Sequence, residues 1–380
     1  MIRQCSIVLL LFFCSSINGQ ESAINFFQKS DKNERFEAGA PILSGMILPL
    51  YTPEMQFAIH GVTAVTFKTR RNNSYLSHSV LPASMLFNPK GSVSVNLCPE
   101  IYWFDDLMLM RINAYYKNRE DNYWGVGMEN AQEVKKSAST TAYKRISYSI
   151  QPDFLIRIHD HFYSGLSFYF NSFRANNMAG LMLEDPDVLQ YGNDIFSGGI
   201  GIMAVLNHYN SLEPASGGYY ISAKGMTYTN KVKSDYSFQQ VHIEYNHYIT
   251  VIRKGSLLAL QLKTVWSFGD IPWVIMPQSG RAETLRGYYK GQYRDKNMAL
   301  MQIEYRHFFN KKGSDQTGRH GFVYWIGGGT VFHKVSEIKN AILSTGAGYR
   351  YRLQPNIILR LDLGFGTENA GTYLGLTEAF

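Results

Sequence analysis

The side chains of this sequence that suggest a specific interaction are charged, and the interaction they suggest is ion pairing. Arg286 lies in a long polar stretch, at Leu285-Arg286-Gly287-Tyr288-Tyr289, while Glu304 and Asp362 stand on the polar faces of alternating segments. The sequence has no Gly-x-Ser-x-Gly motif, phosphate-binding loop or spaced cysteine pair. We therefore expect a protein that is not an enzyme and that has no cofactor and no metal site.

The segments that carry these charges alternate with a period of two, which is typical of strands with one apolar and one polar face. Between Leu257 and Gly269 the apolar face holds Leu258, Leu260, Leu262, Trp266 and Phe268. From Ala299 to Phe308, apolar residues alternate with Gln302, Glu304 and Arg306, and Arg360 and Asp362 occupy the polar face of 357–366. We expect Arg350 and Arg352 to lie on a polar face as well.

Similar segments of about ten residues recur through the chain and predict an all-β fold, a transmembrane antiparallel β-barrel of about 16 strands. The candidates are 42–50, 55–70, 75–87, 92–104, 107–117, 138–158, 162–172, 194–209, 219–230, 236–252, 257–269, 298–309, 322–333, 341–353, 357–366 and 372–380. Long connections follow the fifth, seventh and eleventh candidates, and most other connections are tight. No run of about 18 apolar residues predicts a membrane-spanning helix in the mature chain.

The N-terminus has the layout of a secretory signal peptide, with Arg3 before an apolar run from Ile7 to Phe13. We expect residues 1–19 to be this signal peptide, 20–40 a short periplasmic segment and 41–380 the barrel domain. Cleavage would leave Cys98 as the one thiol, so no internal disulfide is expected. The net charge of +7 is spread along the chain and does not indicate binding to nucleic acid.

The Arg-Gly-aromatic step at Arg286-Gly287-Tyr288 resembles the BamA/TamA superfamily of outer-membrane barrels, also called the bacterial surface-antigen family. The segments that follow it, Tyr293-Arg294-Asp295-Lys296 and Ile303-Glu304-Tyr305-Arg306, are similar to that family too. Weaker similarities are Tyr123-Trp124-Gly125-Val126-Gly127, Cys98-Pro99-Glu100-Ile101-Tyr102, Gly346-Ala347-Gly348-Tyr349-Arg350-Tyr351 and Leu361-Asp362-Leu363-Gly364. Residues 20–40 are too few for the family's periplasmic recruitment (POTRA) domains, so the chain resembles a barrel-only member.

The resemblance implies that the loop around Arg286 folds back into the barrel lumen and that acidic residues of the inner wall hold the arginine. Asp362, Glu304 or both are the candidate partners, because a guanidinium that loses water needs paired acceptors. Gly287 would let the loop approach the wall closely. In the alternative interpretation Arg286 sits in a solvated outer loop, and Asp362 belongs to a separate ladder of lumen charges with Arg350, Arg352 and Arg360.

The resemblance also implies a weakly paired lateral seam between the first and last strands, which an incoming strand could enter. Gly45, Met46 and Pro49 lie in the first strand candidate, and Gly371 and Gly375 lie at the last. Proline removes a ladder donor and glycine weakens a strand. Phe380, at the end of the last candidate, resembles the C-terminal assembly signal of outer-membrane barrels.

These observations leave two functions open. The chain could assist the insertion or translocation of proteins at the outer membrane of a Gram-negative bacterium, with outer-membrane lipid, outer-membrane or surface protein clients and a separate periplasmic partner. Alternatively, it is a non-catalytic structural barrel or passive pore that retains the lumen loop. No Ser/His spacing nominates a lipid-modifying enzyme.

Overall fold

The computed structural model describes residues 32–380, apart from 53–55, 74, 210–216, 252–254, 281–283, 311–316, 355–356 and 377. The predicted signal peptide (1–19) and most of the predicted N-terminal segment (20–40) lie outside these residues.

Antiparallel strands dominate the described chain, with four short α-helices and two short 3₁₀ turns. The strands are β1 (Ile42–Thr52), β2 (Gln56–Phe67), β3 (Ser79–Phe87), β4 (Val93–Leu97), β5 (Glu100–Trp103), β6 (Met108–Asn122), β7 (Ala142–His159), β8 (Phe162–Asn176), β9 (Asp194–Asn207), β10 (Gly218–Tyr228), β11 (Phe238–Thr250), β12 (Ser256–Gly269), β13 (Asn297–Asn310), β14 (Thr317–Phe332), β15 (Ile342–Gln354), β16 (Ile357–Gly366) and β17 (Ala370–Leu376). The helices are α1 (Lys32–Glu37), α2 (Met128–Glu133), α3 (Gly180–Glu184) and α4 (Pro186–Tyr191), and the turns are η3 (Asn230–Val232) and η4 (Val335–Glu337). None of the described helices is long and apolar enough to cross a membrane.

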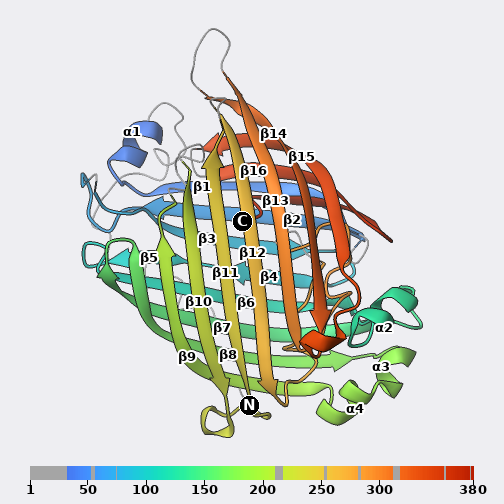
Figure 1. Cartoon of the computed structure of the whole chain (residues 1–380). Coiled ribbons are helices and arrows are strands. Elements are labelled where there is room, and N and C mark those ends of the chain that lie inside the picture. Colours follow the sequence, from blue (N-terminus) through green and yellow to red (C-terminus); the bar gives the residue numbers. More distant parts are fainter. Residues whose placement is uncertain are drawn as a thin grey trace.

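The strands form one curved sheet of 17 members that wraps into a barrel (Figure 1). Neighbours along the chain pair antiparallel, from the β1–β2 ladder to the β16–β17 ladder. The strand is interrupted at Cys98 and Pro99. β4 and β5 therefore both lie between β3 and β6 and share one position in the sheet. The expected all-β antiparallel barrel of about 16 strands is therefore confirmed.

The two faces of the strands differ as the alternation predicted. On β12, Ala259 and Gln261 are buried inside the barrel, whereas Leu262 and Phe268 are exposed on the outside. The same holds on β16, where Asp362 is buried and its apolar neighbours Leu361 and Leu363 are exposed. A polar lumen and an apolar exterior are what a barrel in lipid requires.

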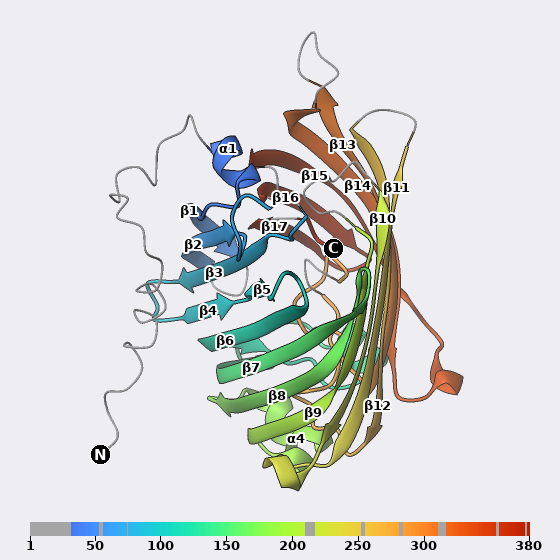
Figure 2. The ribbon, with the colours of Figure 1, turned by 90° about the vertical axis from the view of Figure 1, so that its left-hand side faces the viewer.

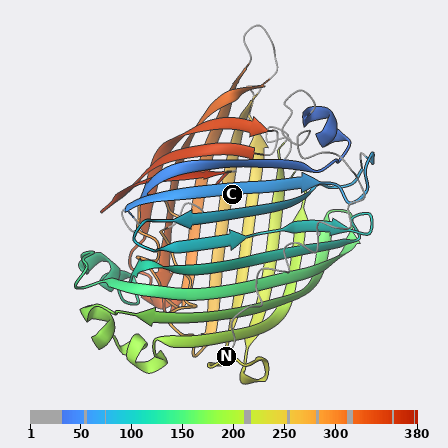
Figure 3. The same cartoon turned by 180° about the vertical axis from the view of Figure 1, so that it is seen from behind.

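The helices α2, α3 and α4 lie together at one end of the barrel (Figure 3), in the connections that follow β6 and β8. The 270–296 connection between β12 and β13 belongs to the same end. The expected long connections are thus present, and they gather at one mouth of the barrel.

The short helix α1 lies beside the opposite end, next to β1 (Figure 2). Its Phe36 ring stacks on His78, with ring centroids 4.2 Å apart, and His78 Nε2 lies 2.9 Å from the Phe36 carbonyl oxygen. The backbone N–H of Lys68 donates to the Gly39 carbonyl at 2.9 Å. The segment before β1 is therefore attached to the connection between β2 and β3.

The opposite polarity of the two faces gives a test on β12. We expect Leu262→Lys to lower the free energy of unfolding in phospholipid vesicles by about 2–4 kcal/mol, because a lysine on the lipid face near the bilayer centre loses its hydration. Urea unfolding followed by tryptophan fluorescence measures the effect. Lys263→Gln, one residue along on the lumen face, is the matched control and should change stability by less than about 1 kcal/mol, because its ion pair with Glu244 is partly exposed and Glu244 keeps its hydrogen bonds from Asn246 and Gln261. Equal losses in both variants would contradict the assigned faces.

Candidate functional site

The connection between β12 and β13 reaches into the barrel and buries Arg286 completely, at 0% exposure. Its Nη1 donates to Asp362 Oδ2 on β16 at 2.7 Å, and its Nη2 donates to Glu304 Oε1 on β13. The guanidinium also lies over the ring of Trp325 on β14, 3.7 Å from the centroid. The structure thus brings Arg286 together with both of its candidate partners.

Gly287 and Tyr288 fix the backbone of the loop against the wall. Gly287 has a φ of 101°, which glycine adopts without strain, and a Cβ there would lie 2.3 Å from the Gly366 nitrogen. Its N–H donates to the Tyr373 hydroxyl on β17 at 2.8 Å. The Tyr288 hydroxyl donates to the Leu343 carbonyl on β15 at 2.6 Å. The motif therefore contacts three of the last strands at once.

Two glycines of β16 make room for this loop. A Cβ on Gly364 would lie 2.7 Å from the Cβ of Arg286, and one on Gly366 would lie 2.5 Å from Cζ of the Tyr288 ring. Any side chain at either position would push the loop from the wall. On the inner face of β16, Asp362 thus supplies a hydrogen-bond acceptor for Arg286, and Gly364 and Gly366 leave space for the loop.

Further charges extend the site along the wall. Asp362 Oδ1 accepts from Arg350 Nη1 at 2.5 Å, and Glu304 Oε2 accepts from Arg306 Nε at 2.9 Å. Arg360 Nε lies 3.6 Å from Asp362 Oδ2. The alternative of a solvated Arg286 is wrong, because its side chain is fully buried, yet the wall ladder of Asp362 with Arg350 and Arg360 exists beside the loop pairing. Arg352 is not part of this ladder in the structure and donates to the Thr317 hydroxyl at 3.1 Å. Each buried carboxylate serves at least two arginines, which compensates the cost of removing the charges from water.

The end of the chain departs from the predicted last strand. The strand expected over 372–380 ends at Leu376, so that part of the prediction is wrong. Glu378 Oε2 accepts from Arg350 Nε at 2.7 Å, and the Phe380 main-chain oxygen accepts from Arg306 Nη2 at 2.8 Å. Residues 378–380 therefore turn inward, because the wall arginines offer partners for a carboxylate that could not stay on an apolar outer face. The role of Phe380 as an assembly signal remains a prediction.

The rest of the loop binds the last hairpin and α2 at the helix-bearing mouth of the barrel. Gln292 Nε2 and the Tyr293 hydroxyl both donate to the Glu368 carboxylate, each at 3.1 Å. Burial and the neighbouring Glu368 carboxylate raise the pKa of Tyr293 well above its ordinary value. The Arg294 guanidinium lies over the rings of both Tyr123 and Trp273, 4.8 and 5.4 Å from their centroids.

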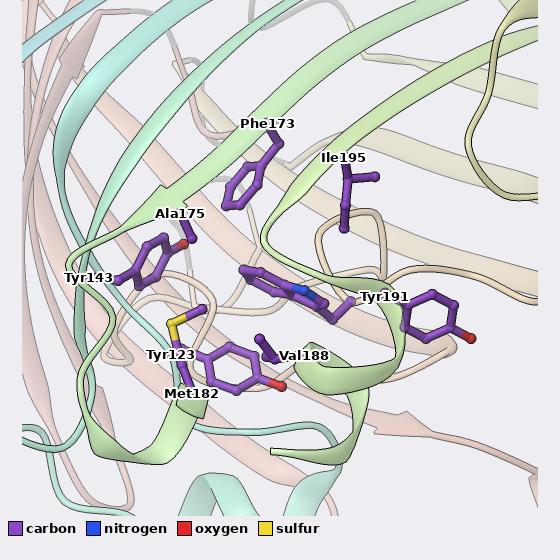
Figure 4. Packing of buried hydrophobic residues seen from close by; sticks show 9 residues of the cluster. Tyr123, Tyr143, Phe173, Ala175, Met182, Val188, Tyr191 and Ile195 are labelled. Carbon is purple, nitrogen blue, oxygen red and sulfur yellow. The ribbon is translucent and has the colours of Figure 1, made fainter. Parts of the chain in front are cut away.

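An apolar cluster rich in aromatic residues lies at this mouth and includes Trp273 (Figure 4). Its buried members are Tyr123, Tyr143, Phe173, Ala175, Met182, Val188, Tyr191, Ile195 and Trp273. They come from the ends of β7, β8 and β9, from α3 and α4, and from the loops that follow β6 and β12. The loop that carries Arg286 is therefore held by this cluster as well as by the barrel wall.

The predicted seam residues lie on the first and last strands. Gly45, Met46 and Pro49 are on β1, and their ladder partners on β2 are Thr63, Val62 and Ile59. Gly371 and Gly375 are on β17 and pair with Gly364 and Arg360 of β16. Between the described residues of β1 and β17 there is no ladder, although β1 lies beside the last strands (Figures 2 and 3).

The sequence did not predict that Trp325, Tyr373 and Glu378 belong to the site. It also did not predict that Arg306 links Glu304 to the end of the chain. Arg306 lies two residues after Glu304, so period-two alternation places both on one face, and this signal was available. Trp325 and Tyr373 could not be recognised as partners of the loop, because their contacts depend on how deeply the loop enters the lumen.

Solved structures with this fold are known. The chain is similar to BamA from Haemophilus ducreyi lacking POTRA domains 1-3, with a TM-score of 0.54 and 14% identity over 90% of this chain and 70% of that one. It is also similar to CdiB from Acinetobacter baumannii, with a TM-score of 0.52 and 11% identity over 88% of this chain and 65% of that one. No family model matches the chain, and no curated protein matches it in sequence. The comparisons therefore establish the barrel fold.

The ion network predicts a large cost for removing its central cation. Arg286→Ala should lower the free energy of unfolding by about 3–5 kcal/mol, because it leaves two buried carboxylates with fewer donors. Arg286→Lys should restore little, since one ammonium cannot bind both acids or stack flat on Trp325. Urea unfolding in vesicles measures both. The control is Lys296→Gln in the same loop. If it lowered the free energy of unfolding as much as Arg286→Ala does, the stabilising role assigned to Arg286 would be wrong.

The clearance at β16 gives a second test. In Gly366→Ala the new methyl group would displace the Tyr288 ring, and overpacking of this kind costs about 1–3 kcal/mol. Hydrogen exchange of the 285–293 backbone should become faster. Gly225→Ala on β10 is the control, since its Cβ would meet nothing within 4 Å. Unchanged exchange in Gly366→Ala would mean that the loop does not rest on β16 in solution.

Proposed function

We propose that this barrel lies in the outer membrane of a Gram-negative bacterium and assists the insertion or translocation of proteins through the seam between β1 and β17. The observation that carries the proposal is that no ladder joins the described residues of these two strands. Elsewhere the sheet is continuous, with registers such as the 11 residue pairs between β1 and β2. An edge with unpaired backbone groups can accept a strand from another chain.

The composition of the two edge strands supports an edge that opens. Pro49 cannot donate a backbone hydrogen bond, and Gly45 and Gly375 add no side chain that could pack across the seam. β17 has only seven residues, against 11 in β1, so part of the β1 edge extends beyond any partner that β17 could offer. A client strand would satisfy these backbone groups, and its side chains would meet lipid on one face and the lumen on the other.

The loop in the lumen would steady one side of this seam. Gly287 donates to Tyr373 on β17, and the Tyr288 hydroxyl accepts from the Thr367 backbone N–H at 3.0 Å. The last hairpin is thus attached to the loop, and through Arg286 to β13. In this proposal the β17 side stays fixed while the β1 side moves.

A passive pore is the competing function. The loops packed at the helix-bearing mouth, with the cluster around Trp273, oppose free passage at that end. In the proposed orientation this mouth faces the cell exterior, and the end beside α1 faces the periplasm, where a separate partner would deliver clients. Large, steady conductance of the purified barrel in a planar bilayer would favour the pore.

Photocrosslinking in cells tests the proposal directly. A photoreactive amino acid in place of Met46, on the β1 edge, should capture many different barrel precursors, which mass spectrometry would identify. Leu86 on β3 is the matched control: like Met46 it is partly exposed on the inner face of its strand, but it pairs on both sides, with His60 and Ser94, so it should capture few or none. One fixed partner would indicate a dedicated exporter or an accessory subunit. Capture of β17 alone would contradict the proposal and favour a closed structural barrel.

A further inference from the structure

The segment that follows β17 occupies a defined place in the lumen. Ala379 is 7% exposed, and Phe380 packs against a small apolar cluster on β11 and β12 formed by Tyr248, Leu257 and Ala259. The Arg306 guanidinium lies over the Phe380 ring, 4.9 Å from its centroid. Residues 378–380 thus meet a surface with both apolar and cationic parts.

Two arginines recognise the polar groups of this segment. Arg350 Nε donates to the Glu378 carboxylate at 2.7 Å, and Arg306 Nη2 donates to the Phe380 main-chain oxygen at 2.8 Å. Both arginines are buried, with side-chain exposures of 0% and 4%. The two arginines thus contact a carboxylate and, two residues later, both the aromatic ring and the backbone oxygen of one residue. This spacing is a chemical pattern that another peptide could reproduce.

Residues 378–380 do not accept from every N–H donor of Arg306 and Arg350. Nη2 of Arg350 and Nη1 of Arg306 are buried and have no acceptor from the described part of the chain. Each arginine also keeps an acid of the wall if the segment leaves, since Arg350 binds Asp362 and Arg306 binds Glu304. Departure would therefore strand neither cation without a counter-charge, and that stranding is what makes most buried ion pairs costly to open.

We propose that Arg306, Arg350 and the Tyr248–Leu257–Ala259 surface form an exchangeable peptide-binding site in the lumen. Residues 378–380 occupy it in cis, and a segment of another polypeptide with a carboxylate two residues before an aromatic residue can replace them. This inference rests on the proposed function in one respect, because only a barrel that admits polypeptide chains would present the site to such a segment.

The site also lies next to the loop network. Glu378 reaches Arg286 through Arg350 and Asp362, and Phe380 reaches it through Arg306 and Glu304. An incoming segment would contact the two arginines that flank the acids of Arg286. Exchange at this site would thus free the segment that follows β17 while leaving the loop in place.

Peptide binding to the purified full-length barrel in detergent micelles tests the inference. The probe is a fluorescent peptide with the sequence of residues 376–380, Leu-Thr-Glu-Ala-Phe, followed by anisotropy. A Glu378→Gln/Phe380→Ala variant, whose own segment is weakened, should bind it at least about tenfold more tightly than the unaltered protein, since a hydrogen bond to a charged group contributes about 1.5–3 kcal/mol. A probe with Gln in place of Glu should bind about tenfold more weakly.

Second substitutions in the loosened variant locate the binding. Added Arg350→Gln should abolish saturable binding, whereas added Lys263→Gln, which removes a lumen cation elsewhere, should leave it unchanged. Failure of the probe to bind the folded loosened variant, or equal loss with both substitutions, would overturn the site. If the variants do not fold, ¹⁹F-labelled Phe380 in the unaltered sequence gives the answer: excess peptide should shift its signal to a solvent-exposed value, and no shift would refute exchange.

This result is separable from the function of the seam. Clients captured at Met46 together with no peptide binding would refute the lumen site and leave the seam function standing. Peptide binding without client capture would leave the site and refute the seam function.

Discussion

A guanidinium that has lost all of its water is the constraint on which the rest of this barrel depends. Arg286 is fully buried, and two carboxylates from strands on either side of Trp325 supply what solvent no longer does. A charge in such a place is tolerated only when its partners are held in position. The inner wall from β13 to β16 is accordingly shaped around one side chain of a loop.

The acids that hold Arg286 are themselves held by arginines. Arg306 and Arg350 bind the oxygens of Glu304 and Asp362 that Arg286 does not use, and Glu378, after β17, binds Arg350 in turn. The loop, the wall and the end of the chain therefore form one electrostatic unit. It joins elements that are far apart in sequence, whereas the ladders join strands that are close neighbours along the chain.

Much of this arrangement was predictable from the sequence, and the reasons are specific. Period-two alternation located the strands and put Glu304, Arg350 and Asp362 inside, because burial and polarity repeat with the pleat. The family resemblance nominated Arg286 and its partners. The inward turn at the end of the chain was not predicted, because alternation continues through Leu374 and Leu376 and does not reveal that Glu378 meets Arg350. Nor could alternation reveal that Asp362 binds Arg286 and also belongs to the wall ladder, since its two oxygens accept from different arginines.

The attachment of α1 has a mechanical consequence. Phe36 and Gly39 are bound to His78 and Lys68, in the connection between β2 and β3, immediately before the chain enters β1. A pull on the segment that precedes α1 would therefore be carried by that connection and spread into the paired interior of the sheet. β1 itself is relieved of the load, so the barrel can be tethered at its N-terminal side without tearing its first strand from β2.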